Sequence, residues 1–110
     1  MTAKLQALGI RLVESVPSDT TLRVVFENQQ GYDEMLAACL VLTIAAEYTP
    51  EAGSVEAAAT RDGKLLFQVR TPTAKVPKFV KRSLSKRQRT LLQQLLTAPP
   101  AGDVPKAVRR

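Results

Sequence analysis

Two segments of the chain alternate apolar and polar residues with the two-residue period of a β-strand. In residues 10–16 and 22–26 apolar side chains recur at alternate positions, and the polar sequence Pro-Ser-Asp-Thr lies between the two segments. Side chains of a strand point alternately to opposite faces, so Ile10, Leu12 and Val16 are expected on one buried face. Two such strands joined by turn-forming residues predict a β-hairpin.

The strongest helical pattern runs from Tyr32 to Tyr48. Its apolar residues recur every three or four positions, and Asp33 and Glu34 place negative charge in the first turn, where the helix dipole favours it. The middle of this helix is apolar on nearly all sides, so it needs cover from more than one direction. A chain of 110 residues has little material for that cover. The pattern therefore indicates a homodimer through this helix, or a partner docked on it.

The dipeptide Asp62-Gly63 predicts the turn of a second hairpin, because these residue types favour the left-handed conformation that a tight hairpin turn needs. We expect its strands at residues 55–61 and 64–70. A helix is the alternative for the first of these segments, since its Glu-Ala-Ala-Ala sequence has helical propensity. In the hairpin, the small alanines are expected to lie beneath the central helix.

The C-terminal third of the chain predicts one further helix. Ser85 and Gln88 fit a capping box, in which each side chain accepts a hydrogen bond from the backbone N–H of the other residue at a helix start. Leucines form an apolar stripe after this box, and the helix is expected to end before the prolines at 99–100. Residues 71–74 are expected to be a linker, and Pro77 is expected to keep the start of the following segment extended.

The order of these elements predicts an α+β protein. A short helix at residues 2–8, with Thr2 as its cap and Gly9 at its end, precedes the first hairpin. The two β-hairpins are expected to form a four-stranded, mainly antiparallel sheet, packed by a central apolar helix and a C-terminal amphipathic helix. Residues 1–97 are expected to form a single domain, followed by a disordered basic tail at 98–110.

Charge divides the chain into two unequal parts. The 110 residues include 16 Lys and Arg and 10 Asp and Glu, which gives a net charge of +6. Residues 1–69 hold five basic and nine acidic residues, whereas residues 70–110 hold eleven basic residues and one acidic residue, Asp103. A basic region attached to an otherwise acidic fold indicates a polyanion as partner.

The residue types argue against an enzyme. The chain has no His and a single cysteine, Cys39, which excludes disulfides, Cys/His zinc sites and His-dependent catalytic triads within one chain. Cys39 falls on the apolar helix, where a buried thiol is inert. Ser83 and Lys86 have the Ser-x-x-Lys spacing of some acyl-transfer enzymes, but the companion motifs of those enzymes are absent. We expect no catalytic residues, no metal and no cofactor.

The basic segment at residues 75–89 is the main indication of function. It holds seven cations and no carboxylate, and phosphate backbones attract such segments because binding releases counterions. Phe79, which lies among the cations, fits either stacking on a base or anchoring the segment to the core. The predicted contact residues are Lys75, Lys78, Phe79, Lys81, Arg82, Lys86, Arg87, Arg89 and, in the tail, Lys106, Arg109 and Arg110.

The first functional hypothesis is a small protein that binds DNA or RNA phosphates largely independently of base sequence. The alternative is an adaptor or inhibitor that docks on an acidic surface of a protein partner. The same basic run is also typical of a solvated face, or of cations that fold back on the acidic part of the chain. No apolar run reaches the roughly 18 residues of a membrane span. Residues 1–9 lack the pattern of a signal peptide, so we expect a cytoplasmic protein without membrane contact.

Overall fold

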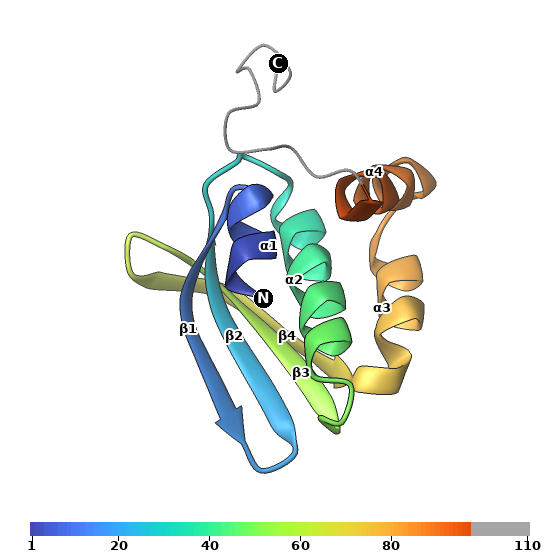
Figure 1. Ribbon diagram of the computed structural model, residues 1–110. Coiled ribbons are helices and arrows are strands. Elements are labelled where there is room, and N and C mark those ends of the chain that lie inside the picture. The colour runs from blue at the N-terminus through green and yellow to red at the C-terminus, as the bar shows by residue number, and fades with distance from the viewer. Residues whose placement is uncertain (98–110) are drawn as a thin grey trace.

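A four-stranded sheet with helices packed against it forms the scaffold of the molecule (Figure 1). The computed structural model describes residues 1–97, and the tail predicted at 98–110 lies outside the described residues. The strands are β1 (Ile10–Ser18), β2 (Thr21–Asn28), β3 (Ser54–Arg61) and β4 (Lys64–Pro72). The helices are α1 (Thr2–Ala7), α2 (Glu34–Tyr48), α3 (Val76–Ser83) and α4 (Lys86–Thr97), with a 3-10 turn at Thr73–Lys75.

The sheet confirms the predicted α+β class and contains one parallel pairing. Its strands lie in the order β1-β2-β3-β4, in which β1–β2 and β3–β4 are antiparallel hairpins and β2 runs parallel to β3. The parallel pairing follows from α2, because a helical crossover returns the chain to the same end of the sheet before β3 begins. Ala57 and Ala59 of β3 pack in the core with α2, so this segment is the predicted strand and not the alternative helix.

Two-residue turns close both hairpins. Asp62 and Gly63 have φ angles of 53° and 79°, which confirms the predicted turn with both central residues in the left-handed conformation. The first hairpin turns through Asp19 and Thr20 alone, with Asp19 at φ 50°. The four-residue turn predicted at 17–20 is therefore too long, because its first half still pairs with β2 as part of an edge strand, where proline is tolerated.

A β-bulge in β1 changes which of its side chains face the core. Val13 has no partner in β2, because the residues on either side of it pair with consecutive residues of that strand. An extra residue reverses the alternation of side chains that follow it. Val16 therefore pairs with Arg23 on the sheet face away from the helices, and the prediction that it shares a face with Ile10 and Leu12 is wrong.

The central helix is covered on all sides by this chain alone. The Asp33 side chain accepts hydrogen bonds from the backbone N–H groups of Met35 and Leu36, so α2 begins at Glu34, two residues later than predicted. Its nine buried residues lie between Leu36 and Ala45, and the helix contacts β2, β3, α1, α3 and α4. Figure 1 shows α1 on one side of α2 and α3 on the other. The chain therefore supplies cover for which a second copy or a partner is expected from the sequence, and a homodimer through this helix stays a prediction.

Residues 76–83 form a helix that the sequence analysis does not predict. Pro77 lies in the first turn of α3, where the missing N–H of proline costs nothing, so the prediction that it keeps this segment extended is wrong. The linker predicted at 71–74 is also wrong. Its residues complete β4 and begin the 3-10 turn that leads into α3.

Sequence signals at helix ends are confirmed at two of three sites. The backbone N–H of Ser85 donates to Gln88 Oε1 at 3.0 Å, and the N–H of Gln88 donates to Ser85 Oγ at 3.2 Å, which is the predicted capping box of α4. Gly9 follows α1 with a φ angle of 78°, as expected of a residue that ends a helix. Thr2 is not the cap of α1, because Met1 holds that position without a side-chain hydrogen bond.

Candidate nucleic-acid interface

Helix α3 presents cations to solvent and buries valines in the core. Val76 and Val80 are buried four residues apart on one side of the helix. Lys81 and Arg82 follow Lys78 by three and four positions, and all three side chains are exposed. Residues at this spacing are neighbours on a helix surface, because a turn contains 3.6 residues. The helix is therefore fixed to the core by one side and directs positive charge outward from another.

The basic segment is attached to the core by its apolar residues. Phe79 is half-buried and packs against the hydrophobic core, and Leu84 and Leu92 are buried in the same core. Two roles are predicted for Phe79, stacking on a base and anchoring the segment to the core. The position of its ring favours anchoring. The attachment gives the surrounding cations fixed positions on two helices rather than on a loose segment.

The first turn of α4 carries cations where the helix dipole is positive. Lys86 and Arg87 are exposed in this turn, which has no acidic residue. Positive charge at a helix N-terminus raises the energy of the helix. Arg89 is half-buried, and its Nε is buried without a hydrogen-bond partner. Lys75, at the end of the 3-10 turn, is exposed as well.

Cations of residues 1–69 form ion pairs, whereas those of α3 and α4 form none among the described residues. Residues 1–97 contain four salt bridges, all formed between residues 4 and 61. They are Lys4–Glu47 at 3.5 Å, Arg11–Glu27 at 3.2 Å, Arg23–Glu56 at 3.0 Å and Arg61–Glu34 at 2.7 Å. None of the seven cations between 75 and 89 pairs with a carboxylate of the described residues. The basic segment packs against α2 through its apolar residues, but its cations are not neutralised by carboxylates of the described residues.

Lys81 and Arg89 both line a groove between α2, α3 and α4. Its volume is about 240 Å³. The rest of its lining is mainly apolar and consists of Thr43, Val76, Pro77, Val80, Leu92 and Gln93. The sequence predicts both cations as contact residues but not the groove, because no spacing along the chain shows how α3 packs beside α4.

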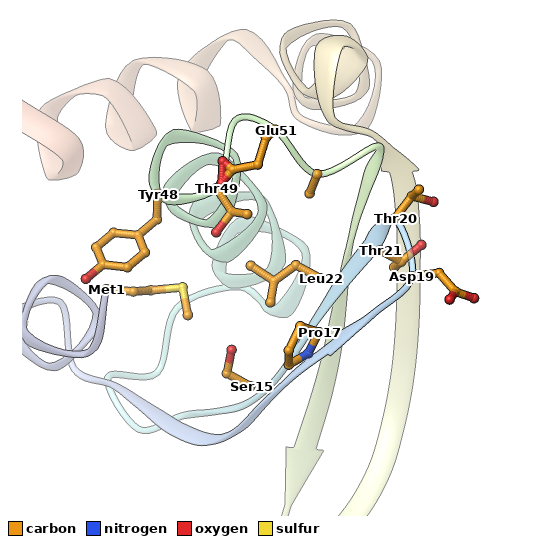
Figure 2. Close-up of a pocket in the computed structure, with 11 residues that line it drawn as sticks. Met1, Ser15, Pro17, Asp19, Thr20, Thr21, Leu22, Tyr48, Thr49 and Glu51 are labelled. Atoms are coloured by element: carbon orange, nitrogen blue, oxygen red, sulfur yellow. The ribbon is translucent and has the colours of Figure 1, made fainter.

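A second cavity, at the C-terminal end of α2, has the opposite charge character. Figure 2 shows it between this helix end and the β1–β2 hairpin, with Tyr48 beside Met1 and with Leu22 on β2. Its volume is about 420 Å³, and its charged side chains are Asp19 and Glu51. Tyr48 is 66% exposed. The sequence does not predict this cavity, because it forms between segments far apart in the chain.

The buried thiol confirms one expectation about the chemistry of the chain. Cys39 is fully buried in α2, and burial raises the pKa of its thiol to about 12. A thiol with this pKa stays protonated at neutral pH and does not act as a nucleophile.

In the part of the chain that the structure describes, His, Cys, Asp and Glu side chains form no group of three suited to a metal ion. None of the helices in this part has the length and apolar character needed to cross a membrane.

The structure places eight of the eleven predicted contact residues on or beside α3 and α4, and brings Lys81 and Arg89 together at one groove. The other three, Lys106, Arg109 and Arg110, lie outside the described residues. Comparison of the chain with protein-family models, with curated proteins and with solved structures gave no match.

Proposed function

We propose that this protein binds nucleic acid through α3 and the start of α4, by phosphate contacts that depend little on base sequence. One observation carries the proposal. The seven cations between 75 and 89 have no carboxylate partner among the described residues, whereas four of the five basic residues before residue 70 form ion pairs. Unpaired cations on neighbouring helices repel one another, and a bound polyanion relieves that repulsion. The sheet and α2 serve as the scaffold for this surface.

The residue types of the surface favour phosphate contacts over base recognition. Lysine reaches phosphate oxygens as a point charge, and arginine adds paired hydrogen bonds to two oxygens. Recognition of single-stranded bases uses exposed aromatic rings as stacking platforms. Phe79 is half-buried, and the exposed Tyr48 belongs to the acidic cavity. Binding is therefore expected to be driven by the release of counterions from the phosphates.

A four-site variant tests the proposal against a control with the same change in charge. The variant replaces four cations of the proposed surface with alanine: Lys81, Arg82, Arg87 and Arg89. The control replaces four cations of the acidic part with alanine: Lys4, Arg11, Arg61 and Lys64.

Anisotropy of a labelled DNA duplex at low salt compares the affinities of both proteins with that of the unaltered chain. The surface variant should bind at least about 100-fold more weakly, and to a similar degree for all duplex sequences. Each phosphate contact that is lost also loses the favourable release of counterions that accompanies it. The affinity of the control for the duplex should fall only a few-fold. Equal losses would show that net charge alone, and not the α3–α4 surface, determines binding.

A second candidate function is an adaptor or inhibitor that docks on an acidic protein surface. The observation that favours it is Leu91, which is 40% exposed and lies one turn after Arg87 on the same side of α4. Protein interfaces combine apolar contacts with complementary charge, whereas a phosphate backbone offers little apolar surface. Absorbance at 260 nm before and after a high-salt wash shows whether nucleic acid purifies with the protein. Material free of nucleic acid that binds one acidic protein, but no duplex, would favour this second function.

A further inference from the structure

The groove between α2, α3 and α4 concentrates positive charge in a partly enclosed space. Lys81 from α3 and Arg89 from α4 line it, and no carboxylate is among its lining residues. Val76, Val80 and Leu92 supply apolar walls. Charges beside apolar walls are screened less than charges on an open surface, so an anion in the groove would be attracted by both cations.

The polar groups that line the groove are mainly hydrogen-bond donors. The Nε of Arg89 is buried without a partner, and a buried donor left unsatisfied costs free energy that only an acceptor can recover. The Gln93 side chain carries an amide with two further N–H donors and one acceptor oxygen. The Thr43 hydroxyl already donates to the Cys39 carbonyl at 2.8 Å, so it is not a free donor. Two cationic side chains and an excess of hydrogen-bond donors therefore suit the groove to an anion.

We propose that this groove holds a phosphate group between Lys81 and Arg89, and that in the protein's nucleic-acid ligand this is the terminal phosphate of a strand. The volume of about 240 Å³ is smaller than the roughly 300 Å³ at which drug-sized ligand sites begin, yet it exceeds several times the ~30 Å³ of one water. A small recess of this kind admits a chain end more readily than a continuous backbone. A terminal phosphate also carries more negative charge than an internal phosphodiester. The proposal of a phosphate site depends only on the groove. The assignment of that phosphate to the end of a strand depends on the proposed function as well.

Orthophosphate tests the phosphate site without any nucleic acid. In ¹H–¹⁵N spectra, the Nε–H signal of Arg89 should shift and saturate as sodium phosphate replaces sodium chloride at constant ionic strength. Lys81→Gln should abolish most of the shift. Lys78→Gln removes the same charge from the same helix but does not line the groove, so it should preserve the shift. The absence of a saturable shift in the unaltered protein would overturn the phosphate site.

Paired oligonucleotides test the strand end. Two single strands of one sequence, one with a 5′-phosphate and one with a 5′-hydroxyl, are compared by anisotropy of a 3′ label. The phosphorylated strand should bind about tenfold more tightly, as expected for an added charge-assisted contact. Lys81→Gln should remove this preference. Lys78→Gln should weaken the binding of both strands equally and leave the preference unchanged.

The two experiments separate the possible failures. Equal affinities for the two strands overturn the assignment of a strand end. Binding to neither strand also overturns the strand end, and a failure to bind duplex DNA as well overturns the proposed function. The orthophosphate titration alone decides whether the groove is a phosphate site.

Discussion

Arg87→Glu should stabilise the fold and weaken nucleic-acid binding at the same time. Arg87 is exposed in the first turn of α4, at the positive end of the helix dipole, and has no ion pair among the described residues. A charge at a helix end contributes about 0.3–1 kcal/mol, and this substitution reverses its sign. Lower repulsion from Lys86 and Arg89 acts in the same direction. We therefore expect the free energy of unfolding to rise by about 1 kcal/mol.

Thermal unfolding at low salt, followed by circular dichroism, measures the change. For a domain of this size, 1 kcal/mol corresponds to a rise in Tm of roughly 4–8 °C. Lys64→Glu is the matched control, because it makes the same change in charge at an exposed residue of β4 that lies far from a helix end in the chain. It should change Tm much less. Added salt should reduce the gain of Arg87→Glu, because salt screens exposed charges.

Two results would refute this reasoning. Unchanged or lower stability of Arg87→Glu at low salt would mean that the cations of α4 carry no local cost. A gain in stability together with undiminished binding would mean that Arg87 serves some purpose other than contact with nucleic acid.

Three further predictions concern the scaffold. Ser85→Ala should lower the free energy of unfolding by about 1 kcal/mol in urea titrations, because it removes the cap of α4, whereas Ser83→Ala, outside the cap, should have a smaller effect. Cys39 should react with a thiol reagent only in denaturant, and rapid labelling of the native protein would contradict its burial and raised pKa. Hydrogen bonds, first from the backbone N–H of Asp62 and then from two side chains, lower the pKa of Glu27. Its folded pKa lies below its unfolded pKa, so its contribution to stability is complete above the unfolded value and is lost as pH falls through the folded value. Glu27→Gln should therefore flatten the fall in stability below about pH 4.5, and an unchanged pH profile would contradict this assignment.

Local signals in the sequence predicted the elements whose geometry is set by neighbouring residues. The Asp62-Gly63 turn and the capping box at Ser85 need only particular residue types at short spacings, and both are present as predicted. The period of apolar residues likewise placed α2 to within two residues at its start. These features depend on backbone conformation within one turn of the chain, so they need no knowledge of the fold.

Features that depend on distant residues could not be predicted in this way. The parallel pairing of β2 with β3 is decided by the path of α2 across the sheet. The bulge at Val13 depends on the register with β2. Helix α3 has only eight residues and gains its stability from burial of Val76 and Val80, so a local signal for it is weak.

The candidate site shows the same division. The uneven distribution of charge along the chain identified the basic segment at 75–89, and six of its seven cations are exposed. The groove at Lys81 and Arg89 is formed by three helices, and the acidic cavity at Tyr48 joins a helix end to a hairpin. Both arise from packing between segments far apart in the sequence, which charge patterns do not show.

The salt dependence of binding tests the central claim most directly. A titration of the protein with duplex DNA across a range of salt concentrations gives the slope of log Kobs against log salt. If the seven cations between residues 75 and 89 each contact a phosphate, the slope should be about −6, and the four-site variant should reduce it to about −3. A slope near zero, or one that the four-site variant leaves unchanged, would contradict the claim that these cations bind a polyanion.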